Sequence, residues 1–69
     1  MQLAQRIRQI RLLKGFSQEY VADKMEISQP AYSRIENKAG SCSFYTLEKL
    51  AKVLEVKLTY LIDVNTPIE

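Results

Sequence analysis

Apolar residues recur at spacings of three and four along this chain, and this period limits the fold more than any other feature. Leu3, Ile7, Ile10 and Leu13 have this spacing, which places them on one face of a helix. A second stripe of the same kind is formed later by residues 47, 50, 51 and 54. No segment alternates apolar and polar residues as a half-buried strand does. The sequence therefore predicts an all-α fold without a sheet.

Capping residues divide the chain into predicted helices. The first helix runs from about Gln2 to Lys14 and is ended by Gly15, a residue that suits the position after a helix. Serines precede the next three helices, because a serine hydroxyl accepts hydrogen bonds from the free N–H groups of a first turn. The second helix ends near Met25, the third spans Gln29 to about Asn37, and the fourth carries the later apolar stripe. The capping serines are Ser17, Ser28 and Ser43.

Shorter segments complete the predicted architecture. Lys38 to Cys42 is expected to be a loop. A short fifth helix follows Val56 and Lys57, with its apolar residues inward (Leu58, Leu61 and Ile62) and two residues outward (Thr59 and Tyr60). Pro67 opposes continuation of a helix. We therefore expect a domain over residues 1–63 and a tail over residues 64–69.

Size and composition restrict the function. Sixty-nine residues, of which 46% are hydrophobic and 26% charged, suit one small globular domain. One cysteine and no histidine leave no basis for a disulfide or a metal site, and the eight acids form no paired constellation, so no catalytic residues are predicted. Apolar runs are far shorter than a membrane span, and the N-terminus lacks the apolar core of a signal peptide. We therefore expect no membrane partner and a cytoplasmic location.

Residues 18–37 meet the physical demands of two helices that cross steeply. A small residue, Ala22, lies in the middle of the first helix, and Ile27 in the turn can anchor it to the core. Tyr32 and Ile35 give the second helix an inner side, while its opposite side offers hydrogen-bonding groups. These polar residues are Gln29, Ser33 and Arg34.

This segment, QEYVADKMEISQPAYSRIEN, resembles the helix-turn-helix of the phage repressor and Cro proteins, often called the XRE family. Ile10 and Arg11 before it, and residues 47–54 after it, resemble the first and fourth helices of that family. The resemblance extends over residues 3–63. It implies a five-helix lambda-repressor-like domain that binds double-stranded DNA in the major groove.

The resemblance also implies roles for individual residues. Gln18 matches a position that contacts a DNA phosphate, and Gln29 matches a glutamine that pairs with adenine N6 and N7. Ser28, Pro30 and Ser33 match positions at the groove or its edge, as does Arg34, for which guanine and phosphate both stay open. Phosphate contacts are implied for the segment after the third helix, where the matching residues are Asn37, Lys38 and Ser43.

Four residues concern the structure of the domain: two match a charged pair of the family, and two differ from the residues that the family usually has. Arg11 and Glu36 match a family ion pair that ties the first helix to the recognition helix. Glu26 stands where the family has glycine, so we expect a formed but strained turn with positive φ. Tyr32 stands where valine or isoleucine is usual, and its hydroxyl must reach water or a partner.

For several residues two interpretations stay open. Arg6, Arg8 and Lys14 are either solubility charges outside the apolar stripe or phosphate contacts. Tyr60 belongs either to a dimer contact or to core packing. Surface ion pairs are favoured for Lys49 and Lys52, and an exposed Cys42 without redox function is favoured for the loop.

The resulting functional hypothesis is a small prokaryotic or phage transcriptional regulator, most simply a repressor. Binding needs no cofactor, and no small-molecule ligand is expected. A homodimer, formed through the fifth helix and the tail, would bind a palindromic operator with half-sites roughly 34–36 Å apart. The alternatives are a restriction–modification controller or antitoxin of the same fold, and a protein-interaction module that does not bind DNA. The net charge of only +2 favours that last alternative.

Overall fold

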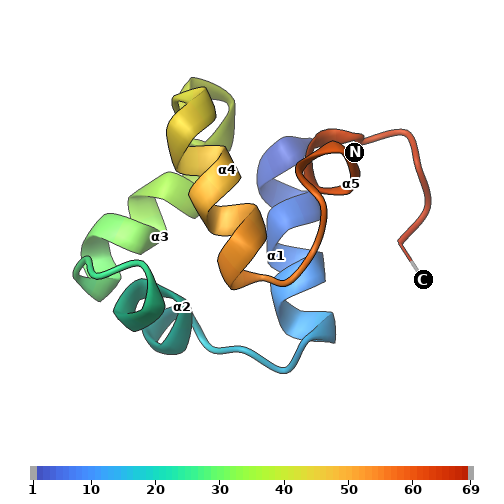
Figure 1. Ribbon diagram of the computed structural model, residues 1–69. Coiled ribbons are helices and arrows are strands. Elements are labelled where there is room, and N and C mark those ends of the chain that lie inside the picture. Colours follow the sequence, from blue (N-terminus) through green and yellow to red (C-terminus); the bar gives the residue numbers. More distant parts are fainter. Residues whose placement is uncertain (1, 69) are drawn as a thin grey trace.

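In the computed structural model, which describes residues 2–68, the chain forms five α-helices and one short 3-10 helix. Helix α4 crosses the middle of the molecule, with α2 and α3 on one side and α1 and α5 on the other (Figure 1). None of the helices in this range is long and apolar enough to cross a membrane. The predicted all-α fold is confirmed. The helices are α1 (Leu3–Leu13), α2 (Gln18–Lys24), α3 (Gln29–Asn37), η1 (Ala39–Ser41), α4 (Phe44–Val53) and α5 (Leu58–Ile62).

The predicted caps begin and end these helices. The side-chain oxygens of Ser17, Ser28 and Ser43 accept hydrogen bonds from backbone N–H groups three residues further on, at 3.0, 3.2 and 3.1 Å. Each bond satisfies one free donor of a first turn. Gly15 follows α1 with φ of 77°, a left-handed conformation that glycine adopts without steric cost.

Every helix contributes to one core. Ala22 is buried where α2 packs on α3, and Ile27 and Ile35 pack against the core from the turn and from α3, as predicted. The later apolar stripe is also confirmed, because Leu50, Ala51 and Leu54 are buried and Leu47 packs against them. The buried apolar residues are Ile7, Ile10, Val21, Ala22, Met25, Tyr32, Ala39, Leu50, Ala51, Leu54 and Leu61.

Three details differ from the sequence predictions. Leu13 is 62% exposed, because it lies in the last turn of α1, which extends away from α5 (Figure 1). Ile62 is 42% exposed, because α5 has only five residues and turns Leu61 rather than its last residue into the core. The segment from Lys38 to Cys42 is not a plain loop. It contains η1, whose Ala39 is buried.

Arg6 corrects a further prediction, since it is neither a solubility charge nor free to reach a phosphate. The residue is fully buried, and its Nε and Nη2 donate to the backbone oxygen of Tyr60 at 2.9 and 2.6 Å. Its Nη1 donates to the backbone oxygen of Thr66, and its guanidinium carbon lies 4.8 Å from the centre of the Tyr60 ring. Tyr60 is therefore half-buried over Arg6 rather than outside. These contacts fasten α5 and residues beyond it to α1.

Candidate nucleic-acid interface

The turn between α2 and α3 is formed and strained. The N–H of Ile27 donates to the oxygen of Ala22 at 3.0 Å, which closes the end of α2. Closing it this way places Glu26 at φ of 61°, the left-handed region that costs a residue with a side chain roughly 1–2 kcal/mol. The predicted strain at Glu26 is confirmed. Glu55, after α4, has the same φ of 61° and was not predicted to be strained.

Helix α3 presents one polar face to solvent. Because successive residues of a helix are turned by about 100°, five of its residues fall within an arc of about 140°. Ser33 is half-buried and the other four are exposed, while Tyr32 and Glu36 lie on the buried side. The structure thus brings most of the predicted contact residues onto one face. The five residues are Gln29, Pro30, Ser33, Arg34 and Asn37.

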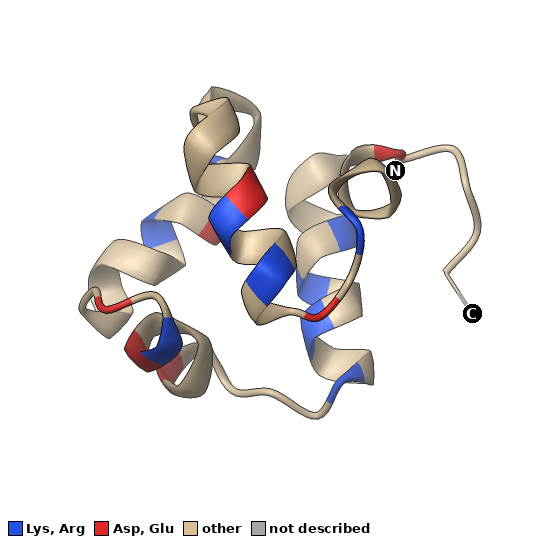
Figure 2. Ribbon diagram, in the orientation of Figure 1, with Lys and Arg blue, Asp and Glu red and all other residues tan. Residues whose placement is uncertain are grey.

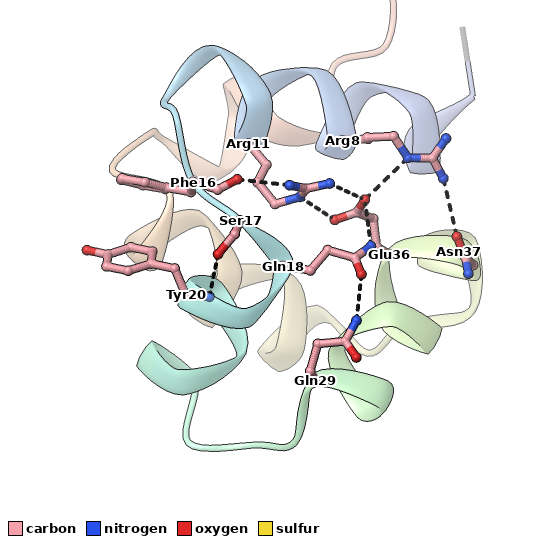
Figure 3. Close-up of polar contacts among 9 residues, drawn as sticks. All are labelled: Arg8, Arg11, Phe16, Ser17, Gln18, Tyr20, Gln29, Glu36 and Asn37. Atoms are coloured by element: carbon pink, nitrogen blue, oxygen red, sulfur yellow. Dashed lines mark hydrogen bonds and ion pairs between the residues drawn. The ribbon is translucent and has the colours of Figure 1, made fainter.

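A buried ion pair holds the other side of α3 against α1. Arg11 Nε donates to Glu36 Oε2 at 2.9 Å, and Arg11 Nη2 donates to Glu36 Oε1 at 3.1 Å (Figure 3). Arg11 Nη1 also donates to the backbone oxygen of Phe16 at 2.8 Å. Both side chains of the pair are buried, so the predicted contact between α1 and the recognition helix is confirmed.

Glu36 is also the centre of a hydrogen-bonded row that reaches the surface. Gln18 Nε2 donates to Glu36 Oε1 at 3.4 Å, and Gln29 Nε2 donates to Gln18 Oε1 at 2.7 Å (Figure 3). On the other side, Arg8 Nε donates to Glu36 Oε1 at 3.3 Å and Arg8 Nη2 donates to Asn37 Oδ1 at 3.2 Å. Three predicted DNA-contacting residues, Gln18, Gln29 and Asn37, are therefore linked through one carboxylate.

The electrostatics of this cluster keep Glu36 charged. Burial is the largest single influence and would raise the pKa of Glu36, but the hydrogen bonds and charge of Arg11, together with its neighbours Tyr32 and Gln18, outweigh burial and lower it. The same contact raises the pKa of Arg11. Burial raises the pKa of Tyr32, and the adjacent carboxylate acts in the same direction. The Tyr32 hydroxyl lies near Glu36 but makes no hydrogen bond of good geometry among residues 2–68.

The remaining predicted residues lie at the start and end of α3 and at the start of α4. Ser28 and Ser43 are exposed, and their oxygens accept from the helices that they cap. The hydroxyl hydrogen of Ser28 remains able to donate, whereas the Ser43 hydroxyl also shares a hydrogen bond of 2.9 Å with Thr46 Oγ1. Lys38 is exposed just after α3. Cys42 is half-buried rather than exposed, and burial raises its pKa.

The basic residues do not gather on one element. Figure 2 shows Lys and Arg on α1, α3 and α4, while α2 carries acidic residues beside a basic one. Among residues 2–68, no three His, Cys, Asp or Glu side chains are grouped so that they could hold a metal ion. Around α3, hydrogen bonds among polar side chains connect this helix with α1 and α2.

The structure shows contacts of Arg8 that neither of its two sequence interpretations includes. The residue lies between Glu36 and Asn37 and donates a hydrogen bond to each. One pattern could have shown this position. Arg8 and Arg11 are three residues apart in α1, so they lie on the same helix face toward α3.

Comparison with known proteins agrees with this geometry. A curated protein of Bacillus subtilis (strain 168), described as the uncharacterized HTH-type transcriptional regulator YqaE, is 30% identical over 59 residues. The alignment covers 86% of this chain and 51% of that protein, so the chain spans about half the length of its relative. No solved structure matches the chain. The model of the helix-turn-helix family matches residues 7–61, and the chain belongs to this family.

Proposed function

We propose that this chain binds double-stranded DNA sequence-specifically and acts as a small transcriptional regulator, most simply a repressor. The observation that carries the proposal is the exposed first turn of α3, where Gln29 is held by Gln18 instead of moving freely. A helix fits the major groove, and residues at its N-terminal end reach the base edges there. Membership of the helix-turn-helix family supports the same function.

The contacts divide into two kinds. Gln29 and Arg34, on the exposed face of α3, reach base edges, where an amide pairs with adenine and a guanidinium with guanine. Gln18, Asn37 and Lys38 lie at the ends of α2 and α3 and contact phosphates, which fix the orientation of the helix. This binding needs no cofactor.

A second copy of the chain completes the proposed operator complex. Leu12 and Leu13 are 60% and 62% exposed, and with Gln9 and Ile68 they line a shallow, mainly apolar pocket of about 350 Å³. At about 100° per residue, Leu13 points nearly opposite to Arg11, which faces α3. A homodimer through this surface therefore leaves both copies of α3 free for the half-sites of a palindrome. The tail contributes through Ile68, and the α1 surface adds to the contact expected from the fifth helix.

Selection of binding sites from random duplex DNA tests the function directly. We expect enrichment of a two-fold symmetric site and an affinity that falls steeply with salt as phosphates are neutralised. Gln29→Ala should lose the preference at one base pair per half-site, at a cost of about 1–3 kcal/mol for the preferred base. Lys57→Ala, at the start of the distant α5, is the matched control and should bind as the parent does.

The selection has a clear contrary outcome. If no sequence is enriched and the affinity does not change with salt, the chain is not a DNA-binding regulator. The basic residues spread over several elements would then suit the alternative of a protein-interaction module (Figure 2).

A further inference from the structure

Each charged group in the hydrogen-bonded row around Glu36 can act either only as a donor or only as an acceptor. The Glu36 carboxylate can only accept, and the guanidinium groups of Arg8 and Arg11 can only donate. A side-chain amide carries an acceptor and a donor, and a half-turn exchanges their places. An amide that contacts one of the charged groups must therefore turn a specified atom toward it.

The carboxylate determines the orientation of two glutamines in succession. Glu36 Oε1 lies 3.4 Å from the Gln18 amide, which must present its Nε2 because two acceptors repel. Gln18 Oε1 then faces Gln29 at 2.7 Å, so Gln29 must present its own Nε2 inward. The outward groups of Gln29 are consequently its Oε1 and the second hydrogen of Nε2 (Figure 3).

The guanidinium of Arg8 acts in the opposite sense on Asn37. Arg8 Nη2 donates to Asn37 Oδ1 at 3.2 Å, which turns the NH₂ group of Asn37 away from the protein. Phosphate oxygens only accept, so an outward NH₂ group suits the backbone contact of this residue.

We propose that Glu36 is a positioning residue that selects, through Gln18, the amide atoms that Gln29 shows to a base pair. This inference rests on the proposed DNA-binding function. An outward acceptor beside one outward N–H complements adenine, which offers the N6 donor and the N7 acceptor. The reversed amide would present both hydrogens of Nε2 and only one lone pair of Oε1, which shifts its complementarity toward the O6 and N7 acceptors of guanine. Glu36 therefore sets a base preference without touching DNA.

Substitution of Gln18 tests this mechanism without breaking the ion pair. In Gln18→Lys, an ammonium group that can only donate faces both Glu36 and Gln29, so the Gln29 amide turns round. We measure the ratio of the dissociation constants of two duplexes, one with adenine and one with guanine at the position whose preference Gln29→Ala abolishes. The parent should prefer adenine by roughly 5- to 150-fold, the range of one bidentate contact. Gln18→Lys should prefer guanine.

Two matched variants separate orientation from affinity. Gln18→Glu keeps an acceptor toward Gln29, so it should bind all DNA more weakly and still prefer adenine. Gln18→Met keeps the size of the side chain but neither accepts nor donates at that point, so its preference ratio should fall toward one. Circular dichroism and melting temperatures establish whether each variant is folded. If Gln18→Lys does not fold, the preference ratios of Gln18→Met and Gln18→Glu decide whether Gln18 orients the Gln29 amide.

The outcomes distinguish the two proposals. A parent protein without any base preference at the Gln29 position would overturn the proposed function. If the parent prefers adenine and Gln18→Lys and Gln18→Met both keep its ratio, the positioning by Glu36 is wrong. A change to guanine in Gln18→Lys, with adenine retained in Gln18→Glu, supports it.

Discussion

At the scale of single residues, the hydroxyl of Tyr32 is an unusual feature of the core. It is buried and has no hydrogen-bond partner in the described part of the chain, and a buried unsatisfied group costs about 1–3 kcal/mol. Tyr32→Phe removes the hydroxyl and keeps the ring, so we expect thermal unfolding to shift upward by roughly 4–8 °C per kcal/mol gained. Tyr45→Phe, at a site that is 71% exposed, should leave the melting temperature unchanged. A lower melting temperature for Tyr32→Phe would show that the hydroxyl donates to Glu36 in solution.

The two arginines that contact Glu36 should differ in their importance for stability. Arg11 is buried and makes two hydrogen bonds to the carboxylate, so Arg11→Ala leaves the buried charge with only the longer contact to the half-exposed Arg8, at a cost of about 3–5 kcal/mol. The Arg8 side chain is 46% exposed and its bond to Glu36 is 3.3 Å long, so Arg8→Ala should cost no more than about 1 kcal/mol. Urea denaturation of both variants measures the difference. Equal losses would contradict the view that Arg11 carries the buried pair.

At the scale of elements, the turn between α2 and α3 stores strain that can be relieved. Glu26 has φ of 61°, which glycine adopts freely, so Glu26→Gly should raise the free energy of unfolding by about 1 kcal/mol. Glu48→Gly, on the exposed side of α4, is the control and should lower it by about 1 kcal/mol, because glycine is a poor helix former. Urea denaturation compares the two. Destabilisation by Glu26→Gly would indicate that the glutamate side chain contributes more than its backbone conformation costs.

The positions of the helices and their capped starts were predictable from local chemistry, whereas the burial of individual side chains was not always so. The serine caps at Ser17, Ser28 and Ser43 depend on residues three positions apart, so the sequence contains the whole interaction. Burial depends on which element lies opposite. Leu13 fits the apolar stripe of α1 and is exposed, whereas Arg6 is buried. Arg6 lies three residues after Leu3 and four before Ile10, so its place on the stripe could have been read from the spacing.

At the scale of the whole molecule, contacts between distant segments were the least predictable. The polar face of α3 was predictable, because helical period and family resemblance both concern nearby residues. The row from Glu36 to Gln29 requires α1, α2 and α3 to be placed together first. The contacts of Arg6 with Tyr60 and Thr66 join residues more than fifty positions apart, and no local pattern indicated them.

The buried carboxylate also makes the stability of the whole domain depend on pH. Glu36 has a pKa lowered from its ordinary value of 4.5, because the opposing effect of burial, though the largest single influence, is outweighed by Arg11 acting together with Tyr32 and Gln18. A group whose pKa is lower in the folded state stabilises the fold fully above its unfolded pKa, and this stabilisation is lost as the pH falls through the folded pKa. The free energy of unfolding should therefore be steady above about pH 5 and should fall in more acidic solution.

Urea denaturation at a series of pH values between neutral and strongly acidic solution measures this dependence. Asp63, at the end of α5, also has a pKa lowered by its bond with Thr66, so part of the acid sensitivity belongs to that exposed residue. Two variants separate the contributions. Asp63→Asn removes only the exposed group, whereas Arg11→Met removes the partner that lowers the pKa of Glu36. The acid-dependent loss should persist in Asp63→Asn and become shallower in Arg11→Met. If Arg11→Met were as acid-sensitive as the parent, the ion pair between α1 and α3 would not be the source of the pH dependence.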